Sequence, residues 1–191
     1  MREWLRALRA ERTFEPMKYF TKGTWVGWQE PGAVSSEALT GSWEKLLTEY
    51  RQQAEGLRDR VPPNAFEFFL EASTHDGQLR SFSVVQETDE PWDGSAETQF
   101  PVRVELVMVE VSGAVWRVVY KNVRRVVIDH PSNEPLFIIG GEGFGDWGYD
   151  ELTDAGGSFL RHEVLFATGA ILLVEFRFVD ARRTPQDRGA G

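Results

Sequence analysis

The sequence of 191 residues predicts a single α+β domain built mainly from antiparallel β-strands. Two observations carry this prediction. Apolar residues alternate with a period of two over most of the chain after residue 65, and tight turns join many of these segments. Strands joined by only a few residues must be antiparallel, because parallel neighbours need long crossovers. We expect about seven to nine strands in meander or hairpin order, one long amphipathic helix packed on the sheet and a short N-terminal helix.

The N-terminal part of the chain predicts two elements. Residues 1–12 form a basic amphipathic pattern without a continuous apolar segment, which indicates a short helix docked on the body and not a secretory signal. Phe20, Val26 and Trp28 share one parity, so we expect a strand that ends before a turn at Pro31.

Residues 42–60 give the strongest helical pattern in the chain. Ser42 is a typical N-cap residue, and apolar residues then recur at spacings of three and four. These apolar residues are Trp43, Leu46, Leu47, Tyr50, Ala54, Leu57 and Val61. Pro62 and Pro63 end the helix, because proline lacks an amide proton and restricts the residue before it. We expect the apolar stripe to lie on the sheet.

Period-two alternation predicts the strands that follow. They cover residues 66–72, 79–86, 102–111, 114–120, 123–129, 136–139, 158–167 and 170–179. Val107, Val109 and Val111 make one of these strands apolar on both faces, which places it centrally in the sheet. The C-terminal residues are polar and include Gly and Pro, so we expect a globular domain over residues 1–182 and a flexible tail over residues 183–191.

The net charge of −9 is concentrated in two stretches of the chain. Residues 87–97 and 142–154 each hold five acidic residues and no Lys or Arg, whereas the remaining 20 acids are balanced by 21 basic residues. We predict that both stretches are acidic loops. Such loops repel a phosphate backbone, so we expect no nucleic-acid partner.

Aromatic residues accompany the acids in both predicted loops. Exposed Trp and Tyr side chains are typical binding anchors, and neighbouring carboxylates steer a basic partner and fix its orientation. The candidate binding residues are Trp92, Asp93, Phe144, Asp146, Trp147, Tyr149, Asp150 and Glu151. The alternative is that Trp92 and Trp147 fold back beneath their own loops.

Motifs for catalysis, metals or cofactors are absent or incomplete. Residues 143–148 match G-x-G-x-x-G, but the acidic stretch after them is too short for the crossover helix of a dinucleotide site. The acids of residues 146–154 lack the spacing of a calcium loop, and no zinc-binding spacing joins His75, His130 and His162. There is no G-x-S-x-G motif. We therefore expect no catalytic residue, no metal and no cofactor.

The sequence also suggests a compartment. The chain has no cysteine, which excludes disulfides and fits a reducing environment. It has no apolar run of about 18 residues, the length that a spanning helix requires. We expect a cytoplasmic protein with no membrane partner.

These observations favour a binding protein over an enzyme. The leading hypothesis is a non-catalytic acidic interaction protein of bacterial type, which binds a basic protein partner through the two acidic aromatic loops. Inhibition of that partner, as by an immunity protein, is one form of this hypothesis. The alternative is a small-molecule or sugar-binding cup, including a carboxylate-based hydrolase that uses the same residues. A third hypothesis is an assembly subunit that pairs an exposed strand.

Overall fold

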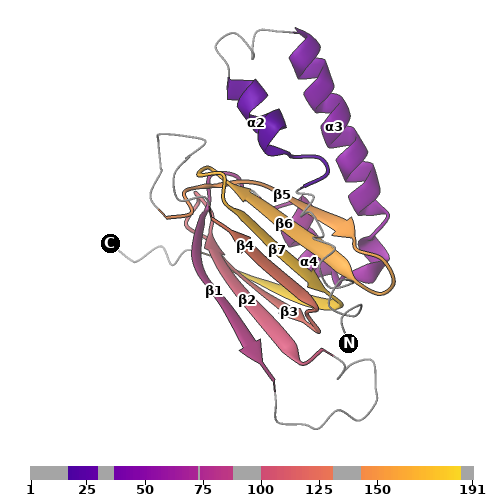
Figure 1. Ribbon diagram of the computed structural model, residues 1–191, viewed down its shortest axis with the longest axis vertical. Coiled ribbons are helices and arrows are strands. Elements are labelled where there is room, and N and C mark those ends of the chain that lie inside the picture. Colours follow the sequence, from indigo (N-terminus) through magenta and orange to yellow (C-terminus); the bar gives the residue numbers. More distant parts are fainter. Residues whose placement is uncertain (1–16, 30–36, 73, 88–99, 131–142, 186–191) are drawn as a thin grey trace, which may run out of the picture.

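The structure is a computed structural model that describes residues 17–29, 37–72, 74–87, 100–130 and 143–185. The described part holds eight strands in two four-stranded antiparallel sheets, together with three α-helices (Figure 1). The α+β class with mainly antiparallel strands is therefore confirmed. The strands are β1 Gln78–Gln86, β2 Val102–Val109, β3 Val115–Lys121, β4 Arg125–Asp129, β5 Trp147–Asp154, β6 Leu160–Phe166, β7 Ile171–Phe176 and β8 Phe178–Thr184.

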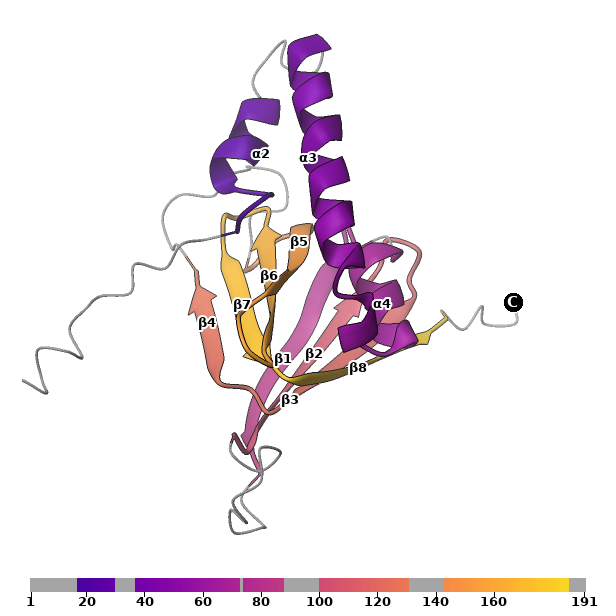
Figure 2. The same cartoon turned by 90° about the vertical axis from the view of Figure 1, so that its right-hand side faces the viewer.

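The two sheets are joined at a corner. One sheet has the order β1-β2-β3-β8 and the other the order β4-β7-β6-β5. Only Arg177 separates β7 from β8, and residues 122–124 separate β3 from β4, so two long bent strands pass from sheet to sheet (Figure 2). Hydrogen bonds continue round this corner, because Arg177 N–H donates to the Lys121 carbonyl at 3.2 Å.

The segment from Lys22 to Gln29 forms helix α2, where a strand was predicted. The hydroxyl oxygen of Thr21 accepts the N–H of Thr24 at 3.1 Å, which is the geometry of a helix N-cap. The prediction of a strand is wrong: three apolar residues of one parity are compatible with a strand, but the threonine cap begins a helix here.

The segment from Pro63 to Leu70 forms helix α4, where a strand was also predicted. Proline suits the first position of a helix, since the amide proton that it lacks would have no partner there. The buried side chains are Ala65, Phe66, Phe68 and Phe69, which follow helical spacing. Helix α4 contacts both β8 and β5, which are edge strands of the two sheets.

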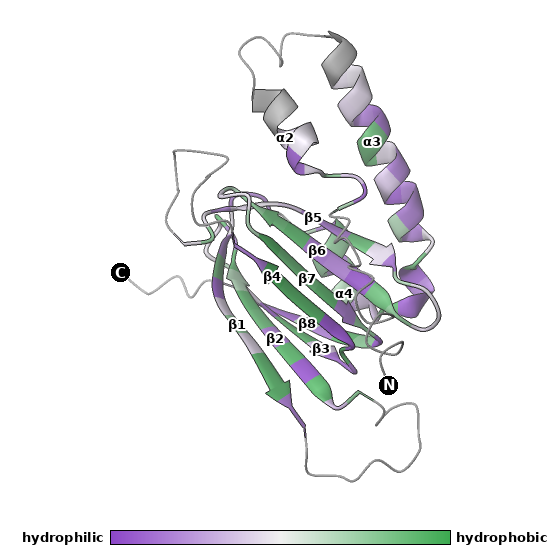
Figure 3. Cartoon of the chain, viewed as in Figure 1, coloured by the Kyte–Doolittle hydropathy of each residue, from purple (hydrophilic) through white to green (hydrophobic). Residues whose placement is uncertain are grey.

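Helix α3 spans Glu37–Glu55 and packs on β5. It begins before Ser42, which is therefore not its N-cap, and a 3₁₀ turn, η2, follows at Arg58–Arg60. The predicted apolar stripe does face the body, because Tyr50 is buried and Leu47 packs against the same cluster. Purple and green alternate along α3 in Figure 3, as expected for an amphipathic helix.

Strands β1 to β4, β6 and β7 lie where alternation predicts them, and β2 is an inner strand of its sheet, also as predicted. Strand β8 runs on to Thr184, so Arg183 belongs to the sheet, where it pairs with Trp116. The second acidic stretch contains β5 and is not a loop. The predictions for residues 1–12, 87–97 and 136–139 fall wholly or largely outside the described residues.

Two apolar clusters hold these elements together. The first fills the space between the sheets and includes Trp116, Tyr120 and Trp147 with Phe68 of α4. The second lies between the outer face of β6 and β7 and the helices α2 and α3. Within the described part of the chain, no helix is long and apolar enough to cross a membrane.

Candidate functional site

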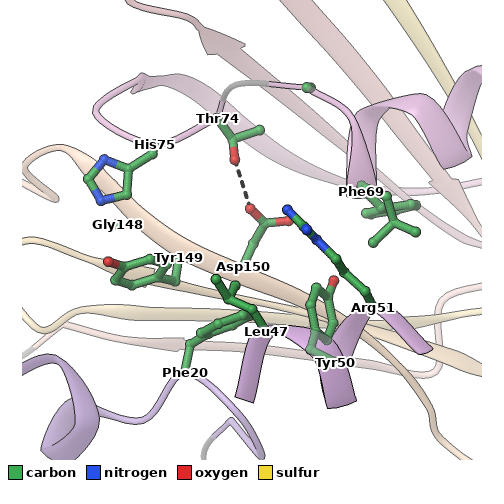
Figure 4. Close-up of a pocket in the computed structure, with 12 residues that line it drawn as sticks. Phe20, Leu47, Tyr50, Arg51, Phe69, Thr74, His75, Gly148, Tyr149 and Asp150 are labelled. Atoms are coloured by element: carbon green, nitrogen blue, oxygen red, sulfur yellow. Dashed lines mark hydrogen bonds between the residues drawn. The ribbon is translucent and has the colours of Figure 1, made fainter. Parts of the chain in front are cut away.

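A pocket of about 280 Å³ opens where the start of β5 meets α3 and the chain that follows α4 (Figure 4). Its walls are largely aromatic or aliphatic, and its polar groups come from three separate segments. The lining residues are Phe20, Leu47, Tyr50, Arg51, Phe69, Leu70, Ala72, Thr74, His75, Gly148, Tyr149 and Asp150. Apolar walls with a few convergent polar groups are typical of small-molecule sites.

The carboxylate of Asp150 is the most buried charged group of the pocket, with 7% of its side chain exposed. Its Oδ1 accepts hydrogen bonds from the Thr74 hydroxyl and from the Trp147 indole N–H, both at 2.9 Å. Its Oδ2 lies 3.2 Å from Nε2 of His162. No Lys or Arg of the described residues forms an ion pair with Asp150, so its charge is held by hydrogen bonds.

The hydrogen bond from His162 belongs to a chain that runs into the core. Nδ1 of His162 lies 2.7 Å from the hydroxyl of Tyr120, and both side chains are fully buried. Burial and the charge of Asp150 raise the pKa of Tyr120 well above its ordinary value. The phenol therefore stays protonated and donates to Nδ1, which leaves the Nε2 proton to donate to Asp150.

This chain of donors leaves one acceptor position on the carboxylate. An ionised carboxylate accepts about four hydrogen bonds, and the protein supplies three. The position left over is on Oδ2, which among the described residues contacts only His162 as a hydrogen-bond donor. A ligand in the pocket can therefore donate a hydrogen bond to Asp150 without displacing one of the protein's own.

The walls of the pocket are fixed by contacts between aromatic rings. The ring of Tyr149 stacks on Phe20 with centroids 5.3 Å apart and meets the imidazole of His75 edge-on at 5.1 Å. The hydroxyl of Tyr50 accepts the Leu152 N–H of edge strand β5 at 3.0 Å, which ties α3 to the sheet. These contacts give the pocket preformed sides.

A bulge at the start of β5 places these groups. Trp147 pairs with Phe166 and Tyr149 with Leu165, so Gly148 is an extra residue in the strand. A Cβ on Gly148 would collide with the ring of Trp25, and glycine is therefore required there. Because of the bulge, Trp147 and Asp150 point to the same face of the sheet, although their numbers differ in parity.

The turn before β1 positions the remaining donor. Asp76 N–H donates to the Trp147 carbonyl at 2.8 Å, and Trp147 N–H donates to the Gly77 carbonyl at 2.7 Å. Asp76 adopts a φ of 63°, which permits this tight approach. The turn is thus fixed to the start of β5 and holds Thr74 over Asp150.

The outer face of the same strands carries a second pair of acids. Glu151 and Glu163 are opposite each other on β5 and β6, and both are buried. The carboxylate of Glu151 accepts the backbone N–H groups of Lys18 at 2.5 Å, Tyr19 at 2.9 Å and Phe20 at 3.4 Å. Glu151 thereby fixes the segment that brings Phe20 to the pocket wall.

Glu163 is less well satisfied than Glu151. Its Oε1 has no hydrogen-bond partner in the described structure, and Arg161 approaches its other oxygen only to 3.9 Å. Burial, followed by the charge of Glu151, raises the pKa of Glu163 from its ordinary value of 4.5 to about 7. Burial likewise raises the pKa of Glu151, against the three backbone donors that lower it.

The six predicted binding residues that the structure describes lie at three places. Tyr149 and Asp150 line the pocket, and Trp147 lies beneath it with its ring fully buried. Glu151 is buried on the opposite face. Phe144 and Asp146 precede β5. The ring of Phe144 packs on Phe166, and Asp146 forms an antiparallel β-bridge with Gln78. Trp92 and Asp93 lie outside the described residues.

The expectation of an exposed acidic loop over residues 142–154 was therefore wrong where the structure describes it. Trp147 and Glu151 are not exposed anchors, because each is fully buried. Asp154 is occupied by an ion pair with Arg60 at 2.8 Å. Glycine and acidic residues are poor strand formers, which explains why the pattern did not predict β5.

Sequence analysis did not identify several residues of the site. Thr74, Tyr120 and His162 come from distant segments and are joined to Asp150 only by the fold. Nothing in the sequence distinguishes Arg51 from the other polar residues of its helix. A buried histidine in the middle of a strand was the one available signal, since such a residue needs hydrogen-bond partners.

Comparison with protein families, with curated proteins and with solved structures finds no match for this chain. Among the described residues, no three His, Asp or Glu side chains are grouped so as to hold a metal ion. Function has to be inferred from the geometry of the pocket.

Proposed function

We propose that this protein binds a small organic molecule in the pocket between α3, the end of α4 and β5. The observation that carries the proposal is the carboxylate of Asp150, which lies nearly buried at the floor of an aromatic-walled pocket. Three donors orient it, and one acceptor position remains for a ligand. Positioning a buried charge in this way is expensive unless it is used, which supports a ligand that donates a hydrogen bond.

The pocket supports binding better than hydrolysis. A glycosidase needs two carboxyl groups on opposite sides of the bond that it cleaves. Asp150 is the only acid among the described lining residues, and the neighbouring Glu151 faces away from it across the strand. Trp147 and Glu151 are buried, so neither side chain is available to a protein partner at the surface.

The proposal is tested by screening a library of small polar molecules against the full chain for a rise in melting temperature. Hits are then measured on two variants of helix α3. Leu47→Trp fills the pocket, because Leu47 lines it, and should weaken every hit at least about tenfold. Lys45→Trp places the same ring on an exposed position of the same helix and should leave affinity unchanged.

If the pocket binds these molecules, the affinities of Leu47→Trp and Lys45→Trp for the hits should differ. Hits that bind both variants as tightly as the unaltered chain would bind elsewhere and would contradict the proposal. A library without hits would contradict it as well. Melting temperatures of the unliganded variants show that each is folded.

A further inference from the structure

The pocket brings together one negative and one positive side chain that do not pair. Asp150 and Arg51 both line it, and Figure 4 shows the guanidinium of Arg51 directed toward the carboxylate of Asp150. No ion pair joins them, and Arg51 forms no ion pair with another acid in the described part of the chain. A ligand between them meets opposite charges at its two ends.

Asp150 suits the cationic end of such a ligand. Its side chain is only 7% exposed, and no Lys or Arg of the described residues forms an ion pair with it. An ammonium group donating to the unused position of Oδ2 would form a charge-assisted hydrogen bond in a site of low dielectric.

Arg51 suits the anionic end. Its side chain is exposed, so a ligand can engage it without first breaking an internal contact. The planar guanidinium presents donors in a fork that matches a carboxylate. Arg51 is on helix α3 and Asp150 is on β5, so the two charges reach the pocket from different elements.

The remaining walls limit the size and character of the ligand. A volume of about 280 Å³ is below the range of drug-sized sites and accommodates a molecule of the size of an amino acid. Leu47, Phe69 and Leu70 provide an apolar surface for its body. Size, charge and polarity therefore converge on one chemical class.

We propose that the ligand is a small zwitterion with an apolar body, such as an α-amino acid, whose ammonium group binds Asp150 and whose carboxylate binds Arg51. This inference rests on the small-molecule function proposed above and specifies its ligand class.

The test measures the affinity of four probes by calorimetry on the full chain. The probes are L-phenylalanine, phenethylamine, 3-phenylpropionate and 3-phenylpropan-1-ol, which share an aromatic body and differ in charge. Phenylalanine should bind the unaltered protein most tightly. Loss of the carboxylate should cost about tenfold because Arg51 is exposed, and loss of the ammonium about a hundredfold because Asp150 is desolvated.

Two substitutions assign the charges to residues. Arg51→Gln should weaken phenylalanine about tenfold and leave phenethylamine unchanged, whereas the control Lys45→Gln removes the same charge outside the pocket and should change neither. Asp150→Asn should weaken phenylalanine about a hundredfold and leave 3-phenylpropionate unchanged. If Asp150→Asn fails to fold, the Arg51→Gln series still tests the anionic end.

The outcomes separate the two proposals. If the neutral alcohol binds as tightly as phenylalanine and Leu47→Trp weakens both, the pocket binds small molecules but the zwitterion is overturned. Equal affinity of phenylalanine for Arg51→Gln and the unaltered protein overturns the role of Arg51. Failure of Leu47→Trp to weaken any ligand found in the library screen would overturn the pocket itself.

Discussion

Asp150 and Glu151 follow each other in β5, and both side chains are largely buried, but their surroundings on the two faces of the strand differ. On the inner face, Asp150 lies opposite Val164, and its charge is held by three side-chain donors. On the outer face, Glu151 lies opposite another acid, Glu163. Burial alone therefore does not determine how an acid behaves in this protein.

The difference lies in the neighbours that each face provides. The inner face offers an imidazole, an indole and a hydroxyl, which all contact one carboxylate. The outer face offers backbone donors to Glu151, whereas one oxygen of Glu163 has no partner among the described residues. Burial, followed by the like charge of Glu151, therefore raises the pKa of Glu163.

The largest expected effect comes from breaking the inner network. His162→Ala removes a donor to Asp150, leaves the hydroxyl of Tyr120 without its acceptor and opens a cavity in the core. We expect the free energy of unfolding to fall by about 3–5 kcal/mol. The exposed histidine His130 provides the control, and its substitution by alanine should cost less than about 1 kcal/mol. Denaturant titration measures both, and similar losses would contradict the network.

The buried acids Glu151 and Glu163 on the outer face should make the stability of the protein depend on pH. Glu163 has a pKa of about 7 in the folded state against an ordinary value of 4.5, so the folded chain holds a proton that the unfolded chain releases. Stability from this group is fully present below pH 4.5 and is lost as the pH rises through 7. We expect a loss of about 2–3 kcal/mol between pH 5 and pH 8.

Glu163→Gln isolates this effect, because glutamine has the shape of the protonated acid. The variant should be more stable than the unaltered protein at pH 8 and about equally stable at pH 5. Glu44→Gln, on the exposed side of α3, should show no such difference between the two pH values. A variant that is equally stabilised or destabilised at both values would contradict the raised pKa.

A smaller effect is expected at Tyr120, the last side chain of the hydrogen-bond network that begins at Asp150. Tyr120→Phe keeps the ring and removes only the hydroxyl that donates to Nδ1 of His162. The cost should be about 1–2 kcal/mol, the penalty of one buried acceptor without a partner. Thermal unfolding measures it. A loss as large as that of His162→Ala would show that Tyr120, and not the histidine, holds the network together.

Alternation was sufficient to predict the regular strands but not the site. Strands such as β2 and β7 are short, mainly apolar segments bounded by turn residues, which is enough to mark them as strands. Strand β5 contains a glycine and four polar or charged residues, and the bulge at Gly148 shifts the parity of Trp147 against Asp150, so no alternation is visible in the sequence. Helices α2 and α4 were missed because short helices carry too few turns to establish a period.

The contacts of the candidate site could not be derived from the chain alone. Tyr120 and His162 belong to different sheets and meet only because β3 and β6 face each other across the core. Asp150 was a candidate from the start, but as part of a loop for a protein partner. The structure instead shows that Thr74, Trp147 and His162 contact its carboxylate at the edge of a pocket.

The bent strands at the corner have a consequence for how a ligand reaches the pocket. Strands β3 and β4, like β7 and β8, are covalently continuous through the corner, and the hydrogen bonds between them continue as well. We therefore expect the two sheets to resist moving apart as separate rigid bodies. Helix α3 rests against β5 through side chains such as Tyr50. If the pocket binds a ligand as proposed, a tilt of α3 would admit a larger molecule more readily than a separation of the two sheets would.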